Sequence, residues 1–130
     1  MDKMLKYYIA WLGGIPIAII NAVVRNIIYG PYMSELTAHQ ISTVTGIILI
    51  YCYYLLLDRR WPIDSMKQAQ TIGLSWVILT IIFEFVFGHY VMGNPWSRLL
   101  HDYNILEGRI WLLFLVNLLA SPITIYKRRN

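Results

Sequence analysis

Residues 68–88 read QAQTIGLSWVILTIIFEFVFG, and this run of 21 residues contains one charged side chain, that of Glu84. About 20 residues of α-helix are needed to cross the hydrocarbon core of a bilayer. A helix also satisfies its own backbone hydrogen bonds, which lipid cannot do. The stretch therefore predicts a membrane-spanning helix, and the carboxylate near its end needs a separate explanation.

Three other apolar runs have a similar length, at residues 7–28, 38–57 and 110–126. Only 14% of the 130 residues are charged and 58% are hydrophobic, whereas soluble domains carry about 25% charged residues. The first run contains Arg25 and no clear cleavage pattern follows it, so we expect a retained helix and not a signal peptide. The sequence predicts an all-α, polytopic membrane protein in which residues 1–130 form a single transmembrane four-helix bundle.

The basic residues divide unevenly between the two sides of such a bundle. Eight lie on the side that holds both termini and the loop between the second and third helices, against three on the other side. Because basic residues favour the cytoplasmic side, we expect a protein of the cytoplasmic (inner) membrane with both termini in the cytoplasm. Topology and anionic lipid then explain the net charge of +4, and no motif indicates nucleic-acid binding. The eight are Lys3, Lys6, Arg59, Arg60, Lys67, Lys127, Arg128 and Arg129, and the three are Arg25, Arg98 and Arg109.

The predicted outer side carries mixed acids, bases and imidazoles. Arg25 and Glu84 lie at similar depth, near the outer edge of the hydrocarbon, where ionisable groups are costly and either pair or face a cavity. Glu84 is expected to pair with Arg25 or Arg109, and the sequence leaves open whether this is a structural ion pair or part of a polar pocket. The candidate pocket residues are Arg25, Glu35, His39, Glu84, His89, Arg98, His101, Asp102, Glu107 and Arg109.

The second outer loop, residues 89–109, is too long for a simple turn. Asn94 and Pro95 are typical of a helix start, with Asn as the N-cap and Pro as the first helical residue. The loop is therefore predicted to contain a short amphipathic surface helix at about residues 95–103, lying as a lid over the outer mouth of the bundle. Its apolar stripe consists of Trp96, Leu99, Leu100 and Tyr103.

Smaller features give further local expectations. Thr37 and Ser65 each begin a sequence that fits a helix-capping box. Cys52 is a single cysteine, so it forms no disulfide within the chain, and we expect it to be a buried packing residue. Small and polar residues lie along one side of each helix, which favours either contacts between helices or a lined cavity. They include Asn21, Thr43, Gly46, Gly73, Thr80, Asn117 and Ser121.

The sequence predicts no metal site and no cofactor. Glu84 and His89 are five residues apart, a spacing that does not form a natural chelate on a helix. Glu35 and His39 have a suitable spacing only if their helix begins before Thr37, and no second motif accompanies them. No phosphate-binding loop, nucleophile elbow or zinc-protease motif occurs.

The stretch FEFVFGHYVMGNPWSRLLHDYNILEGRIW, residues 83–111, resembles a family of small uncharacterised prokaryotic membrane proteins. ELTAHQ at residues 35–40 and the arginine at position 25 are similar as well. The resemblance covers about half of the chain. It implies a four-helix integral membrane protein, and no activity is attached to the family.

Three functional hypotheses remain open. The first is a transport, channel or small-ligand-binding role at an outward-facing polar pocket, in a homo-oligomer because four helices make a thin pore. The second is a non-catalytic accessory subunit that docks a partner membrane protein. The third is an enzyme that modifies a lipid or quinone, which is least favoured because no nucleophile or metal motif is present.

Overall fold

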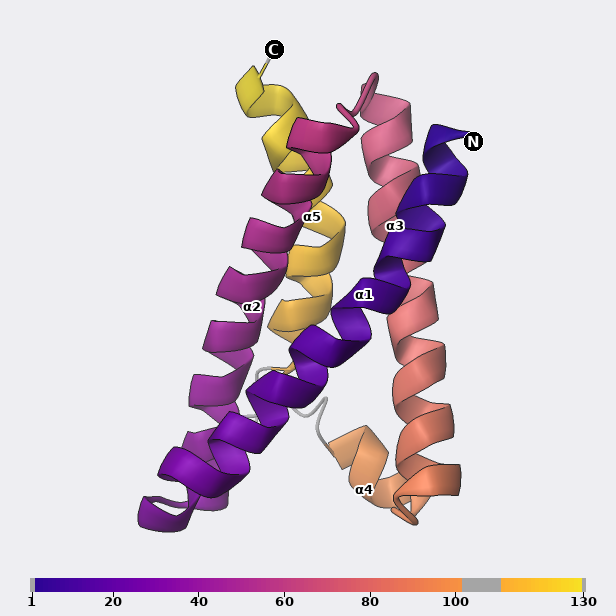
Figure 1. Ribbon diagram of the computed structural model, residues 1–130. Helices are drawn as coiled ribbons and strands as arrows, with labels where there is room; N and C mark the ends of the chain where they lie inside the picture. The colour runs from indigo at the N-terminus through magenta and orange to yellow at the C-terminus, as the bar shows by residue number, and fades with distance from the viewer. Residues whose placement is uncertain (1, 102–110, 130) are drawn as a thin grey trace.

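The computed structural model describes residues 2–101 and 111–129, and this part of the chain forms helices and no strands. Four longer helices make a bundle, and one short helix lies beside it at one end (Figure 1). Both termini lie at the opposite end, which we call the terminal end; the other is the α4 end (Figure 1). The helices are α1 (Lys3–Val24), α2 (Glu35–Arg60), α3 (Met66–Val86), α4 (Trp96–His101) and α5 (Trp111–Arg129).

Within the described part of the chain, three helical runs are long and apolar enough to cross a membrane: Lys3–Tyr32, Glu35–Arg60 and Met66–Val91, with 30, 26 and 26 residues. The first continues α1 through a π-helical turn and a 3₁₀ turn, and the third continues α3 through another π-helical turn. The helix α5 is not one of the three, since the last three of its 19 described residues are basic. The structure thus supports three of the four predicted spanning helices by length and composition.

The predicted start of the second helix is wrong. The helix α2 begins at Glu35 because its N-cap is Ser34, whose Oγ accepts a hydrogen bond from the N–H of Thr37 at 3.1 Å. Thr37 is therefore inside the helix, and the capping box predicted there does not form. Glu35 and His39 consequently lie one turn apart on the same side of α2.

Other boundaries differ by a few residues. The capping role predicted for Ser65 is confirmed, since its Oγ accepts from the N–H of Gln68 at 3.0 Å. The helix α4 begins at Trp96, one residue later than predicted, and residues 102–103 of the expected surface helix lie outside the described residues. At the terminal end, α1 and α5 extend past residues 7 and 126 to Lys3 and Arg129.

The helices α3 and α5 pack closely because Gly73 removes a side chain from their interface. A Cβ atom at this position would lie 2.6 Å from the carbonyl oxygen of Leu119. Polar side chains join α5 to α2: the Asn117 amide donates to the carbonyl of Ile47 at 3.3 Å and accepts from the Ser121 hydroxyl at 2.9 Å. Gly73, Asn117 and Ser121, which the sequence assigned to one side of their helices, therefore make contacts between helices or within one helix.

The helix α1 crosses the bundle at an angle, near α3 at the terminal end and near α2 at the α4 end (Figure 1). Its hydrogen bonds follow this course. The Trp76 indole of α3 donates to the carbonyl of Tyr7 at 3.2 Å, whereas the Asn21 amide of α1 donates to the carbonyl of Ser42 on α2 at 2.9 Å. The helices α1 and α3 therefore move apart toward the α4 end.

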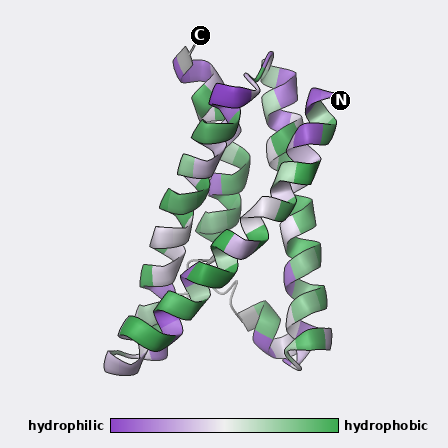
Figure 2. Ribbon diagram, viewed as in Figure 1, coloured by the Kyte–Doolittle hydropathy of each residue, from purple (hydrophilic) through white to green (hydrophobic). Residues whose placement is uncertain are grey.

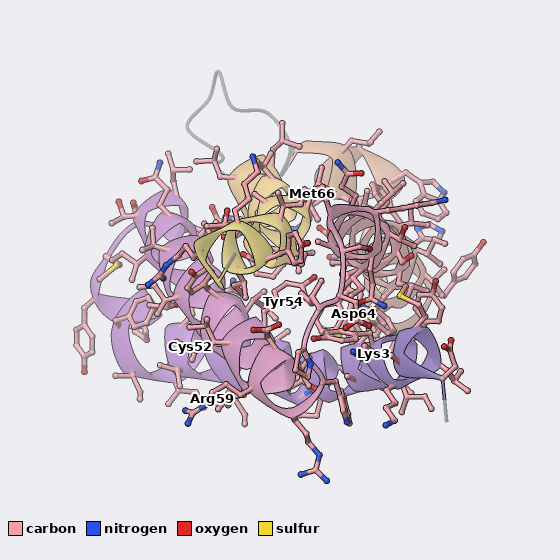
Figure 3. The ribbon with its side chains drawn as sticks, turned by 90° about the horizontal axis from the view of Figure 1, so that it is seen from above. Lys3, Cys52, Tyr54, Arg59, Asp64 and Met66 are labelled. Carbon is pink, nitrogen blue, oxygen red and sulfur yellow. The ribbon has the colours of Figure 1, made fainter. Side chains whose placement is uncertain are left out.

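Large aromatic side chains fill the terminal half of the bundle, which we call the packed half. Trp76 stacks on Tyr54 with ring centroids 4.5 Å apart, and Tyr54 lies at the centre of the bundle (Figure 3). Tyr7 closes the same region, its hydroxyl donating to the carbonyl of Trp61 at 2.9 Å. Cys52 points outward instead and is exposed (Figure 3), so the expected buried cysteine is wrong. Side chains two residues apart on an α-helix point about 200° away from each other, so Cys52 faces outward because Tyr54 faces inward.

Hydrophobic residues predominate along the long helices (Figure 2), and many of their side chains are exposed. On the first spanning run, Ile20, Ile27 and Ile28 are 62%, 70% and 63% exposed. Apolar surface of this extent is unusual for a protein in water, whereas bilayer hydrocarbon matches it. The surface agrees with the predicted membrane environment.

Candidate functional site

A cavity of about 340 Å³ lies between α1, α2, α3 and α5, on the α4 side of the aromatic core. We call this half of the bundle the hollow half. The inner part of the cavity is apolar and is lined by Trp11, Ile50, Trp76, Phe114 and Leu118. Its other part holds the polar side chains, beside apolar ones of Phe83, Phe87 and Leu99; the polar residues are Asn21, Arg25, His39, Ser42, Thr80, Glu84 and Asn94.

The cavity exists because α1 presents small side chains to it. Gly14, Ala18 and Ala22 are four residues apart, so they share one face of the helix, and all three line the cavity. Gly46 on α2 lines the cavity as well but is closely packed, since a Cβ atom there would lie 3.3 Å from the Asn21 amide nitrogen. Of the small and polar residues that the sequence assigned to packing or to a cavity, Asn21, Gly46 and Thr80 line this cavity.

Arg25 lies at the polar end of the cavity and is held by neutral oxygens. One terminal guanidinium nitrogen donates to the Ser42 hydroxyl at 3.4 Å, and its Nε donates to the Asn26 side-chain carbonyl at 3.2 Å. Asn21, one turn earlier on α1, accepts from the hydroxyl of Thr45 at 2.7 Å and so fixes this corner of α1 against α2. Among the described residues, the guanidinium therefore has no carboxylate partner.

Glu84 faces the cavity from the opposite wall, on α3. The sequence offered Arg25 and Arg109 as its partners. The hydrogen bonds of Arg25 go to side chains of its own turn and of α2, so the structure does not show the Arg25–Glu84 pair, and Arg109 lies outside the described residues. One turn before Glu84, the hydroxyl of Thr80 accepts from the Trp11 indole at 3.0 Å, which joins α1 to α3 beside the polar end.

A second hollow of about 580 Å³, the vestibule, adjoins the polar end of the cavity. Glu35 and Arg98 both line it and form an exposed ion pair, with the carboxylate oxygen and guanidinium nitrogen 4.0 Å apart. An exposed pair of this kind contributes little to stability, although it places both charges at the mouth. The residues that line both hollows are Arg25, His39, Asn94 and Leu99.

The short helix α4 closes one side of the cavity through Leu99, which is buried. Leu99 fits against Gly88, where a Cβ atom would lie 2.7 Å from the leucine methyl group. The turn from α3 to α4 is held by His89, whose ring stacks on Trp96 at 3.7 Å and whose Nδ1 lies 2.8 Å from the carbonyl oxygen of Asn94. His89 therefore positions α4 and lines neither hollow.

The structure brings several predicted pocket residues together and places others elsewhere. His89 lies in the turn before α4, and His101 is the last residue of α4. Asp102, Glu107 and Arg109 lie outside the described residues. The predicted residues that surround the cavity and vestibule are Arg25, Glu35, His39, Glu84 and Arg98.

Several lining residues were not predicted as part of a site. Asn21 carried a usable signal, because it lies one turn before Arg25 on the same face. Ser42 lies with Thr43 and Thr45 in the first turns of α2, and small polar residues of this kind are too common in membrane helices to indicate a site. Trp11 and Trp76 belong to apolar runs whose inward face cannot be recognised from composition.

The aromatic core forms the floor of the cavity. Trp76 lines the floor and is 1% exposed, and Tyr7 and Tyr54 beyond it are both 0% exposed. These rings separate the cavity from the terminal end. The arrangement suits a pocket with one polar mouth and one apolar, closed end.

Comparisons with protein-family models, curated proteins and solved structures find no match for this chain.

Among residues 2–101 and 111–129, no three His, Cys, Asp or Glu side chains cluster so as to hold a metal ion.

Proposed function

We propose that this chain is a four-helix protein of the cytoplasmic membrane, with α5 as the fourth spanning helix and both termini in the cytoplasm. The hydrogen bond from the Asn117 amide to the carbonyl of Ile47 joins α5 to α2, and both termini lie at one end of the bundle (Figure 1). That end carries eight of the eleven basic residues, as the cytoplasmic side of membrane proteins does. The α4 end and the vestibule then face outward. This arrangement is in line with the resemblance to small prokaryotic membrane proteins.

We further propose that the protein binds a small ligand in the outward-facing cavity. The observation that carries this proposal is a hollow of about 340 Å³ with Arg25 and Glu84 at its polar end and aromatic rings at its floor. Pockets for small molecules have volumes of about 300–1,000 Å³ and combine apolar walls with a few polar groups. Ionisable groups inside a membrane are costly and mark binding sites or ion pathways.

Ligand binding fits the geometry better than a continuous channel does. The buried rings of Tyr7, Tyr54 and Trp76 fill the packed half, and conduction would require this core to open.

Native mass spectrometry of the protein extracted in mild detergent tests this proposal. The wild type is expected to carry a bound small molecule that Ala22→Phe excludes, because residue 22 lines the cavity and a phenyl ring there fills it. Val23→Phe is the matched control, since the neighbouring Val23 is 47% exposed and lies outside the cavity lining. It should retain the bound molecule.

Two results would contradict ligand binding in the cavity. One is wild-type protein that never carries a bound molecule when purified from its native membrane. The other is an adduct that persists unchanged in Ala22→Phe, provided that Ala22→Phe and Val23→Phe have the wild-type elution volume and helix content.

A further inference from the structure

We infer that the ligand of the cavity is a single-chain amphiphile with an anionic head, a carboxylate or a phosphate, which binds at Arg25 with its tail toward Trp76. This inference rests on the proposed ligand-binding function. It specifies the charge of the head, the direction of the tail and the number of chains, and each follows from a separate feature of the cavity.

The charge of the head follows from Arg25. Its guanidinium donates to the Ser42 hydroxyl and the Asn26 amide oxygen, and both acceptors are neutral. An arginine presents five N–H donors in a planar fork that matches a carboxylate or phosphate. A cation at membrane depth that lacks an acidic partner among the described residues recruits an anion, because charge-assisted hydrogen bonds are the strongest that such a site can form.

The direction of the tail follows from the gradient along the cavity. Going from Arg25 toward the packed half, the polar side chains end and the rings of Trp11, Phe114 and Trp76 remain, while Phe83 and Phe87 line the α3 wall near Glu84. An apolar chain is stabilised there by dispersion contacts with these rings, and it has no polar groups that need hydrogen-bond partners. The head can reach Arg25 from the vestibule, because Arg25 lines both hollows.

The number of chains follows from the volume. About 340 Å³ is near the lower limit of small-molecule pockets, which run from about 300 to 1,000 Å³. A single aliphatic chain fits such a space better than the two chains of a membrane phospholipid.

Quenching of tryptophan fluorescence by a dodecanoate brominated at its last carbon tests the inference. The full-length protein is placed in phosphatidylcholine nanodiscs, and the probe is added at low mole fraction. We expect saturable quenching, of which a defined part disappears in Trp76→Phe because the brominated end lies beside that indole. A dodecyl phosphate brominated at its last carbon should bind as well, whereas the matching trimethylammonium probe should give no saturable quenching.

The substitutions at position 25 test the head. Arg25→Gln should raise the half-saturating probe concentration about tenfold or more, and Arg25→Lys should retain most of the affinity because the charge remains. Phosphatidylglycerol in the nanodisc separates the sources of the head: competition indicates a membrane phospholipid and overturns the single-chain assignment, and absence of competition supports it.

The outcomes separate this inference from the ligand-binding proposal. Equal affinity of wild type and Arg25→Gln, or tighter binding of the cationic probe, would overturn the anionic head. An adduct that native mass spectrometry finds in the wild type and not in Ala22→Phe would, in that case, still support a pocket for another class of ligand. Wild-type helix content in each variant shows that a loss of quenching is not a loss of fold.

Discussion

In the packed half, hydroxyl and indole groups donate to backbone carbonyls of neighbouring helices, whereas in the hollow half small side chains leave space between the same helices. Tyr53 on α2 donates to the carbonyl of Ala10 on α1 at 2.6 Å, and Tyr54 donates to the carbonyl of Leu118 on α5 at 3.1 Å. In the hollow half, by contrast, α1 presents only small side chains to the cavity on this face, and Ala22 is the last of them. One set of helices therefore builds a rigid base and an open pocket.

The difference shows how a small membrane protein can keep a cavity. Bilayer hydrocarbon supplies no hydrophobic force between helices, so their association rests on close packing and hydrogen bonds. A cavity forfeits dispersion contacts of the atoms that line it. The packed half offsets this loss, and α1 can diverge from α3 because its first turns are fixed by Tyr7 and its last turns by Asn21.

Truncation of a tryptophan in each half is expected to give the largest difference in the loss of stability. Trp76→Ala should lower the free energy of unfolding by about 3 kcal/mol, because it extends the cavity into the buried core and removes both the stacking on Tyr54 and the hydrogen bond to the Tyr7 carbonyl. Trp11→Ala should cost clearly less, since it enlarges an existing cavity at a half-buried position. Denaturant titration in mild-detergent micelles measures both, and equal losses would contradict the division into halves.

Glycine substitution should show a smaller difference of the same kind. Gly73→Ala places a methyl group 2.6 Å from the Leu119 carbonyl oxygen, so α3 and α5 must separate and stability should fall by about 1–3 kcal/mol. Gly14→Ala meets only a methyl group of Ile50, at 3.9 Å, and should be neutral or stabilising by up to about 1 kcal/mol through helix propensity. The same titration compares them. A loss in Gly14→Ala as large as in Gly73→Ala would show that α1 is packed more tightly than described.

The smallest effects are expected from the ion pairs at the two ends. Lys3 lies 2.8 Å from the carboxylate of Asp64 (Figure 3), and Lys3→Ala should cost up to about 1 kcal/mol. Arg98→Ala breaks a longer, exposed pair with Glu35 and should change stability by less than about 0.5 kcal/mol. Double-mutant cycles measure the coupling energy of each pair. A larger coupling energy for the Arg98 pair than for the Lys3 pair would contradict this ranking.

The sequence predicted the helices better than the site. Apolar length is a local property, so it identified the runs that became α1, α2 and α3. It could not identify their inward faces, because a membrane helix is apolar on all sides. Cys52 and Tyr54 show the consequence: both lie in one apolar run, yet only Tyr54 is buried. The start of α2 was missed because Ser34, and not Thr37, adopts the capping conformation.

The composition of the cavity depends on long-range geometry. Arg25 and Glu84 were predicted from their cost in lipid, which is a property of each residue alone. Their partners were not predictable, because the angle at which α1 crosses the bundle brings Arg25 to Ser42 on α2 and away from Glu84 on α3. The aromatic floor depends on the same crossing.

The division into halves is tested most directly by comparing two buried serine positions, one in each half, for their access to a reagent added from outside. Ser42 on α2 lines the cavity, and Ser121 on α5 lies in the packed part of the bundle; they are 5% and 2% exposed. Each is changed to cysteine in a Cys52→Ser background, and intact cells are treated with membrane-impermeant sulfonatoethyl methanethiosulfonate. We predict that Ser42→Cys reacts from outside and that Ser121→Cys reacts only after denaturation. Equal protection of both cysteines, or reaction of Ser42→Cys only from the cytoplasmic side, would contradict an outward-facing cavity above a closed core.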